Sequence, residues 1–298
     1  MPVREMADPS RHNRTMPLPT ILSISSQVVY GHVGNAAIVP ALQALGFEVL
    51  AIPTVLLAHH PGHGPPQGRV TPATEVAALV DGLEQVGALA GARAALTGYL
   101  GLAQTAEVAA DAVLRLRRLN PGALYLCDPV IGDNGKVYVR EGVEDAIRER
   151  MLPLADIVTP NHFELERLSG HSVRTLAQAL AAARYLLALG PKTVVVTSLE
   201  HDQLAPGEIA TLAVTPTEAW ICTTTRLHNV PRGSGDLMAA LLLGHILRGR
   251  TVVEALALAV SAVQVVLAAS VDQPEMRLVD RLGDLAAPPL LLMHAVAM

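Results

Sequence analysis

Short apolar strand segments alternate with helix-length segments along most of this chain, and this alternation limits its fold more than any other feature. The first unit runs from a strand at 21–25 through a helix at 36–45 to a second strand at 49–57. Such a unit joins two parallel strands through a crossover helix. The alternation continues to Thr197. Further strands are expected at 94–100, 124–130, 156–159 and 192–197, and further helices at 74–90, 103–119, 143–152 and 175–189. A hairpin at 209–223 and two helices at 235–248 and 252–269 are expected to follow. The sequence therefore predicts an α/β fold, with one domain over residues 19–298 and a central, mostly parallel sheet with helices on both faces.

Residues 1–18 lie outside this pattern. They hold charges of both signs, three prolines and no apolar run, so we expect a disordered N-terminal extension rather than a signal peptide. The longest apolar stretch, 252–271, contains Glu254 and Gln264 and is expected to be a buried core helix, not a membrane span. Two cysteines in apolar runs and a net charge of −5 without a basic run indicate a cytoplasmic protein with no membrane or nucleic-acid partner.

The segment 231–240 carries the strongest chemical signal. Gly233 and Gly235 flank Ser234, and Asp236 follows directly before an apolar helical run. Glycines can take backbone angles closed to other residues and leave room for a ligand. The free N–H groups and the dipole of the helix start attract anions. A carboxylate beside such an anion site suits phosphoryl transfer to a hydroxyl, although the same residue types also form ordinary helix caps.

Three acidic or amide side chains follow strand ends. Asp128 ends a buried apolar strand, where an aspartate faces a ligand or metal or forms a turn before Pro129. Asn161 and Glu164 begin a helix after another strand, with the spacing of a capping pair. The same two side chains would also suit hydrated Mg²⁺, which takes few protein ligands.

The loop 59–68 contains three histidines, at positions 59, 60 and 63. A zinc site is one interpretation, but no neighbouring Cys, Asp or Glu completes a ligand set. Pro and Gly favour a mobile segment. A substrate-covering flap and an inert loop therefore stay open as alternatives.

Five motifs occur in a fixed order: 26–35 (SQVVYGHVGN), 97–101 (TGYLG), 127–130 (CDPV), 160–164 (PNHFE) and 233–236 (GSGD). In this order the chain resembles the ribokinase-like superfamily and, within it, the bacterial dimeric type of pyridoxal kinase, over roughly residues 20–272. The first motif is the most specific for pyridoxal kinase. The Asn-x-x-Glu and Gly-x-Gly-Asp motifs belong to the whole superfamily.

The resemblance implies an ATP-dependent kinase of the 5′-hydroxymethyl group of pyridoxal, with pyridoxine and pyridoxamine as further candidate substrates. Asp236 would accept the hydroxyl proton, and Gly233, Ser234 and Gly235 would form the anion hole. Asn161 and Glu164 would hold Mg²⁺ through water. A monovalent cation is a further candidate cofactor, and a homodimer is implied.

The resemblance also assigns residues to the two substrates. Implied for ATP are Asp128, Thr159, Glu164 and Thr197. Implied for the B6 substrate are Ser26, Tyr99, Asp236 and the flap residues Pro61 and Gly62. The sequence departs from the family at Ser234, where Thr or Val is usual, and at Gln27, where His is frequent.

Motifs of other protein classes are missing from the sequence. There is no P-loop motif Gly-x-x-x-x-Gly-Lys-Ser/Thr, and no Gly-x-Gly-x-x-Gly follows the first strand. Hydroxymethylpyrimidine kinase is the closest alternative, and the 26–35 motif argues against it. Another hydroxymethyl or sugar kinase of the superfamily, or a non-catalytic pyridoxal-binding protein, are further alternatives. A carrier would need none of Asn161, Glu164 and Asp236.

Overall fold

The computed structural model describes residues 18–289 and 291–296. Its strands are β1 (Thr20–Val28), β2 (Glu48–Leu57), β3 (Gly68–Val70), β4 (Ala92–Thr97), β5 (Leu124–Cys127), β6 (Gly132–Asp133), β7 (Lys136–Val137), β8 (Ile157–Val158), β9 (Thr193–Leu199), β10 (Glu208–Val214), β11 (Ala219–Thr225) and β12 (His294–Ala295). Its α-helices are α1 (Asn35–Ala44), α2 (Ala73–Gln85), α3 (Ala103–Leu119), α4 (Val143–Ala146), α5 (His162–Ser169), α6 (Leu176–Ala188), α7 (Ser234–Leu247) and α8 (Val252–Ala269). The predicted extension 1–18 lies outside the described residues except for Leu18.

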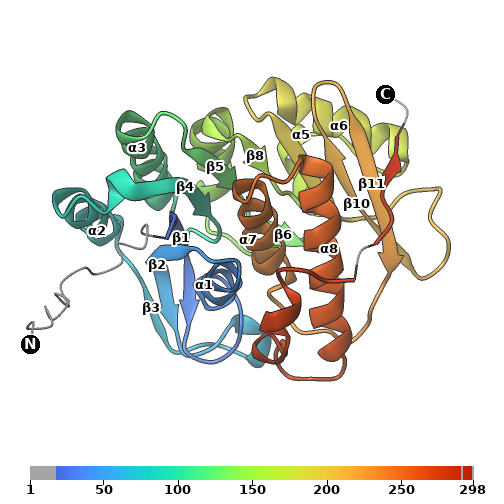
Figure 1. Cartoon of the computed structure of the whole chain (residues 1–298), viewed down its shortest axis with the longest axis horizontal. Coiled ribbons are helices and arrows are strands. Elements are labelled where there is room, and N and C mark those ends of the chain that lie inside the picture. Colours follow the sequence, from blue (N-terminus) through green and yellow to red (C-terminus); the bar gives the residue numbers. More distant parts are fainter. Residues whose placement is uncertain (1–17, 290, 297–298) are drawn as a thin grey trace, which may run out of the picture.

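Ten of these strands form one sheet, in the order β12-β11-β10-β9-β8-β5-β4-β1-β2-β3 (Figure 1). The six strands from β9 to β2 in this order are parallel, and the remaining four pair antiparallel at the two edges. The predicted hairpin at 209–223 is the β10–β11 pair. The mostly parallel sheet expected from the strand–helix alternation is therefore confirmed.

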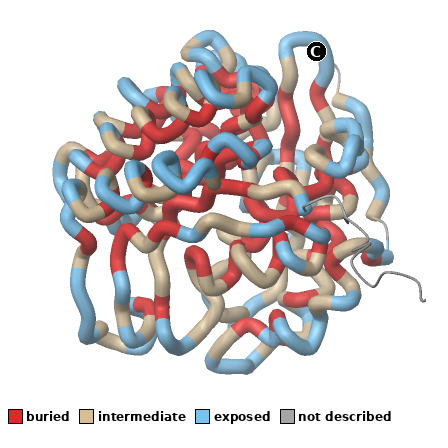
Figure 2. The backbone as a smooth tube through the Cα atoms, turned by 60° about the vertical axis from the view of Figure 1, so that its left-hand side comes forward, coloured by how far each residue is buried: buried red, intermediate tan, exposed pale blue. Residues whose placement is uncertain are grey.

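Helices cover both faces of the sheet, because neighbouring residues of each central strand face opposite sides. Leu22 and Ala95 pack into the apolar core under α2, α3, α5 and α6. Ile21 and Leu96 pack into a second core under α1, α7 and α8. Figure 2 shows the buried strands between helices whose outer sides are exposed. Both faces of the central strands are thus buried, as is usual for parallel sheets.

Helix α8 matches the predicted core helix. Among the residues that the structure describes, it alone has the length and apolar composition to cross a membrane. Its side chains Ala255, Leu256 and Ala259 are fully buried in the core that it shares with α7. It lies beside α7 against β10 and β11 (Figure 1). This packing is that of a core helix in a globular domain.

Several predicted boundaries differ from the structure. The strand expected at 124–130 ends at Cys127, since Pro129 has no N–H to continue a ladder. The helix expected at 143–152 is α4 followed by one π-turn and a 3₁₀ turn, Leu152–Leu154, that contains a proline. The helix expected at 74–90 ends at Gln85, where Gly87 with φ of 74° follows. Despite these differences, the motifs 127–130, 160–164 and 233–236 still lie at strand ends or helix starts.

Candidate active site

A cavity of about 380 Å³ opens where the parallel strands β5, β8 and β9 end, beside the start of α7. Open α/β sheets bind their ligands at the carboxyl ends of the strands. The cavity brings together these residues singled out in the sequence: Asp128, Thr159, Asn161, Glu164, Thr197, Gly233, Ser234, Gly235 and Asp236. Three of the five motifs, 127–130, 160–164 and 233–236, therefore meet in one place.

The two glycines of the anion loop have different roles. Gly233 precedes α7 with φ of 109°, and a Cβ there would lie 2.0 Å from the carbonyl oxygen of His32. Only glycine fits this position. Gly235, in contrast, lies in the first helical turn without a left-handed angle, and an added Cβ would have no neighbour within 4 Å. The expectation that the glycines take backbone angles closed to other residues is thus wrong for Gly235. Its small size instead leaves open space.

Among residues 18–289 and 291–296, no side chain caps the start of α7. Asp236 lies in the first turn and is half-buried. The backbone N–H of Gly34 stabilises the charged form, but burial raises the pKa of Asp236 to about 6. A Cβ on Gly98 would lie 3.6 Å from its Oδ1. The carboxylate therefore faces the ends of β1 and β4, while the N–H groups of the helix start are left for a ligand.

Asp128 is a buried carboxylate, 7% exposed, at the end of β5. The hydroxyl of Thr159 donates to its Oδ1 at 2.8 Å. Burial, and then the charge of Asp236, raise its pKa to about 7. In the described part of the chain no Lys or Arg forms an ion pair with it. A strongly shifted carboxyl group in a cleft is typical of a functional site.

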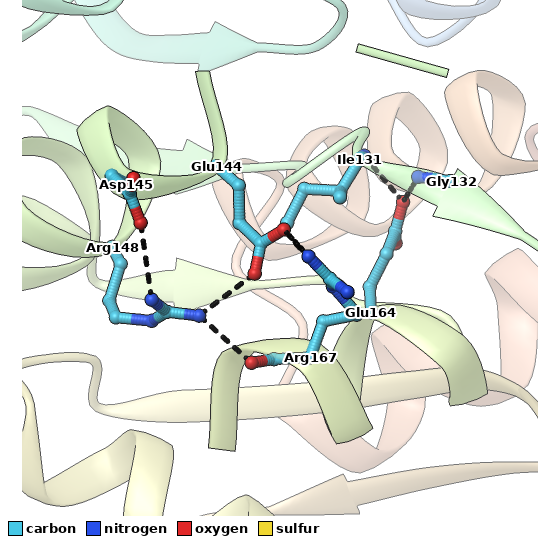
Figure 3. A network of polar contacts seen from close by, with 7 residues as sticks. All are labelled: Ile131, Gly132, Glu144, Asp145, Arg148, Glu164 and Arg167. Atoms are coloured by element: carbon cyan, nitrogen blue, oxygen red, sulfur yellow. Dashed lines mark hydrogen bonds and ion pairs between the residues drawn. The ribbon is translucent and has the colours of Figure 1, made fainter. Parts of the chain in front are cut away.

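Asn161 and Glu164 form the capping pair that the sequence predicted. The Asn161 Oδ1 accepts from the Glu164 N–H, and the Glu164 Oε2 accepts from the Asn161 N–H, both at 2.9 Å. The Glu164 Oε1 accepts from the N–H groups of Ile131 at 2.8 Å and Gly132 at 3.3 Å (Figure 3). Burial and the charge of Asp128 raise the pKa of Glu164 despite these donors. The carboxylate thus fixes the loop after β5 onto the start of α5.

A second set of ion pairs holds α5 in place. Glu144 on α4 binds Arg148 at 2.9 Å and also pairs with Arg167 on α5, as Figure 3 shows. These side chains are partly exposed, so each pair contributes little by itself. Together they connect the two helices beside the Glu164 site.

Of the residues implied for the B6 substrate, Asp236 lines this cavity. The other four, Ser26, Tyr99, Pro61 and Gly62, are not part of its lining. Ser26 packs against Gly34, where a Cβ would lie 2.2 Å from the Ser26 Oγ. The Tyr99 carbonyl accepts from the Thr54 hydroxyl at 2.6 Å. Pro61 and Gly62 begin a 3₁₀ turn, Pro61–His63, in the 59–68 loop.

The 59–68 loop reaches the anion loop. A Cβ on Gly62 would lie 3.1 Å from the Arg232 Nε. The structure therefore places this loop against the residue that precedes Gly233, where a substrate-covering flap would lie.

Several residues that line the cavity were missed by the sequence analysis. Arg232 lies with its guanidinium 5.7 Å from the ring centre of Tyr138. Arg226 also lines the cavity and pairs with Glu200 at 2.5 Å. Gln264 and apolar residues of α8 line its far end. Arg232 could have been found from its position next to the Gly-Ser-Gly-Asp motif, but the α8 residues carry no motif.

Comparisons with known proteins agree with this fold and site. The solved structure of pyridoxal kinase from Leishmania donovani, in complex with ADP and pyridoxamine, has a TM-score of 0.88 and 29% identity, covering 93% of this chain and 99% of that one. A pyridoxal kinase from Entamoeba histolytica also has a TM-score of 0.88, at 26% identity, covering 94% of this chain and 100% of that one. The architecture is therefore that of a ribokinase-like kinase.

Sequence comparisons make the assignment narrower. The family model for phosphomethylpyrimidine kinase matches residues 41–277. The pyridoxal kinase PdxY of Rubrobacter xylanophilus is 47% identical over 274 residues, which cover 91% of this chain and 94% of that protein. The PdxY of Deinococcus radiodurans is 45% identical over 254 residues, covering 83% and 85%. The chain belongs to the phosphomethylpyrimidine kinase family and, within it, to the pyridoxal kinases.

Proposed function

We propose that this protein transfers the γ-phosphoryl group of ATP to the 5′-hydroxymethyl group of pyridoxal and forms pyridoxal 5′-phosphate. Pyridoxine and pyridoxamine are included as candidate acceptors. The observation that carries the proposal is the placement of Asp236 directly after the Gly233–Ser234–Gly235 turn, at an uncapped helix start that opens into the cavity. Membership of the pyridoxal kinases supplies the acceptor.

In this reaction the protein mainly positions the reactants and stabilises charge. Asp236 accepts the hydroxyl proton as the new oxygen–phosphorus bond forms, since an alcohol is a far weaker acid than a carboxyl group. The N–H groups at the start of α7 stabilise the negative charge of the transferred phosphoryl group. Gly233 holds these N–H groups in place against His32.

The donor set near the cavity fits a divalent cation. Asp128, Glu164 and Asp236 are carboxyl groups with raised pKa values, and the ion pairs found among the described residues include none of them. Mg²⁺ favours oxygen ligands and keeps several waters. We propose that Asn161 and Glu164 hold it through water and that Asp128, Thr159 and Thr197 lie near the nucleotide phosphates. When bound, Mg²⁺ supplies positive charge that shields the phosphates.

Three further features belong to the same proposal. A homodimer follows from the resemblance, and Val29 and Tyr30, 80% and 53% exposed, offer apolar surface for an interface. A cytoplasmic location is consistent with two free, buried cysteines. A monovalent cation as an additional cofactor rests on the resemblance alone. Sedimentation at micromolar concentration tests the dimer, and a single monomeric species would contradict it.

A turnover assay separates the candidate functions. Purified protein is supplied with MgATP and, in turn, with pyridoxal, pyridoxine, pyridoxamine and hydroxymethylpyrimidine. We expect a higher kcat/KM with pyridoxal than with the pyrimidine. The reverse order would assign the protein to the pyrimidine reaction, which the matching family model also names. Binding of pyridoxal without any phosphate ester would indicate a carrier.

A further inference from the structure

A carboxylate from the C-terminal segment meets the flap, defined here as residues 59–68. The Glu275 Oε1 lies 2.5 Å from the Nε2 of His63 and 3.0 Å from the Nε2 of His60. Its Oε2 accepts from the backbone N–H of His32 at 3.2 Å. The Glu275 side chain is only 10% exposed and is separated from the flap by 212 residues in sequence. Sequence analysis could not have found this partner for the flap histidines.

Two histidines and a glutamate in contact also fit a metal site, because their ligand atoms lie within 4.8 Å of one another. The hydrogen bonds of His60 argue against it. The Nδ1 of His60 accepts from the N–H of Gly62 at 3.0 Å, so this nitrogen carries no proton. A neutral imidazole has one donor and one acceptor nitrogen. The proton of His60 is therefore on Nε2 and faces the Glu275 carboxylate, whereas a metal would need a lone pair there.

The protonation state of His60 agrees with this tautomer. Burial lowers the pKa of His60, although the negative charge of Glu275 acts to raise it. The neutral form is therefore favoured. The Nε2 of His60 is buried, and its 3.0 Å contact with the carboxylate lies outside the angular range of a hydrogen bond. His63 therefore makes the direct hydrogen bond, and His60 adds a close polar contact.

Glu275 also lies against the 26–35 motif, and its neighbour Met276 lies against the anion loop. A Cβ on Gly31 would lie 2.5 Å from the Glu275 Oε2. The next residue, Met276, is buried, and its Cε would lie 2.8 Å from a Cβ on Gly233. The segment that holds the flap therefore also supports the glycine that orients the anion hole.

We propose that Glu275 is a positioning residue that latches the flap against the acceptor side of the active site, through His60, His63 and the His32 N–H. The proposal rests on the kinase function proposed above for the link to turnover. The latch itself is a property of the free protein. Without the carboxylate, the flap loses the anionic group that both histidines face.

The test replaces Glu275 with glutamine and follows amide hydrogen exchange and kinetics. The amides of Gly62, His63 and Gly64 are bonded only within the flap. We expect them to exchange about tenfold faster or more in Glu275→Gln. We expect kcat/KM for pyridoxal to fall about 10- to 100-fold, the effect of losing a charge-assisted hydrogen bond, while KM for ATP changes little.

Asp272→Asn is the matched control. It makes the same carboxylate-to-amide change in the same segment, and an asparagine Oδ1 still accepts from the Asn229 Nδ2, as Asp272 does at 3.0 Å. Its φ of 57° suits asparagine. Flap exchange and kinetics should equal those of the wild type.

A double-mutant cycle guards against a merely structural effect of Glu275→Gln. His63 is exposed, so His63→Asn should leave the fold intact and loosen the flap by a similar factor. The double variant should then show little more than either single one. Additive effects, or flap exchange unchanged in both variants, would overturn the latch.

Two other outcomes are decisive. Tetrahedral absorption on titration with Co²⁺, lost in Glu275→Gln, would show a metal site and overturn the latch. If the wild type phosphorylates no B6 substrate but Glu275→Gln still frees the flap, the latch stands and the kinase function fails.

Discussion

Replacing Asp128 with asparagine is expected to stabilise the ligand-free protein at alkaline pH while lowering its activity. Asp128 is buried, and its carboxylate accepts from the hydroxyl of Thr159, for which an asparagine oxygen serves equally well. The substitution therefore keeps the shape and this hydrogen bond, removes the charge, and replaces the second oxygen with an NH₂ group. Buried charges without a cationic partner oppose folding.

The magnitude follows from the pKa. The pKa of Asp128 rises from an ordinary 3.8 to about 7 in the folded state, about three units. A raised carboxyl pKa means that the folded state binds the proton more tightly, so the ionised group lowers stability as pH rises from about 4 to 7. At about 1.4 kcal/mol per unit, the penalty is about 4 kcal/mol at pH 8 and under about 2 kcal/mol at pH 5. Asp128→Asn should therefore raise Tm by about 5–10 °C at pH 8, and by much less at pH 5.

Asp156 provides the opposite control. It is as deeply buried as Asp128, at 6% exposed, but it pairs with Lys192 at 2.8 Å and with Arg117 at 2.6 Å. Burial alone would raise its pKa, yet these cations and the Tyr125 N–H lower it. Its charge therefore stabilises the fold above about pH 4, and Asp156→Asn should lower Tm at both pH 5 and pH 8.

The assay is thermal unfolding of both variants and the wild type, at pH 5 and pH 8, without nucleotide or Mg²⁺. Turnover with pyridoxal is measured in parallel. Suppose that Asp128→Asn lowers Tm at pH 8, or changes it equally at the two pH values. Asp128 is then a structural residue, and its ionised carboxylate does not lower the stability of the fold. The proposed role of Asp128 near the phosphates would then lose its physical support.

Two further predictions concern the neighbouring motifs. Glu164→Gln leaves one of three buried backbone N–H groups without an acceptor, so we expect a loss of about 1–3 kcal/mol in stability, measured by denaturant unfolding, and a higher Mg²⁺ requirement for turnover. An unchanged Mg²⁺ requirement would leave Glu164 with a capping role only. Gly233→Ala should unfold the anion loop and lower both Tm and activity, because its Cβ would lie 2.0 Å from a backbone oxygen. Gly235→Ala, with open space around it, should keep Tm and weaken ATP binding, measured by calorimetry; equal Tm losses in both alanine variants would contradict this difference.

Local signals explain why much of the fold could be predicted. The bounds of α3 and α8 match the predicted ranges, because Asn120-Pro121-Gly122 ends the first and a capping pair at Thr251 begins the second. Strand ends were harder to predict. The strand expected at 124–130 ends at Cys127, just before the buried Asp128. The π-turn after α4 has no sequence signature that separates it from an ordinary helix.

The part of the candidate site that is formed by sequence motifs could be predicted. Asp128, Glu164 and Asp236 each follow a strand or begin a helix, so the topology alone brings them to one edge of the sheet. The contact between Glu275 and the flap could not be predicted, because it depends on tertiary packing between segments 212 residues apart. The histidine loop therefore lacked an acidic partner in the sequence, although it has one in the structure.

The role of Asp236 as the base of phosphoryl transfer is tested by the turnover of Asp236→Asn, compared with the wild type under saturating MgATP and pyridoxal. Asparagine keeps the size of the side chain and removes both the base and its negative charge. Burial raises the pKa of this carboxyl group to about 6. We predict a kcat lowered by roughly 10²–10⁴-fold, with Tm equal or higher and with ATP and pyridoxal still bound. Asparagine caps helices about as well as aspartate, so a capping role predicts no loss of kcat. A near-normal kcat would remove Asp236 from the mechanism and contradict the account.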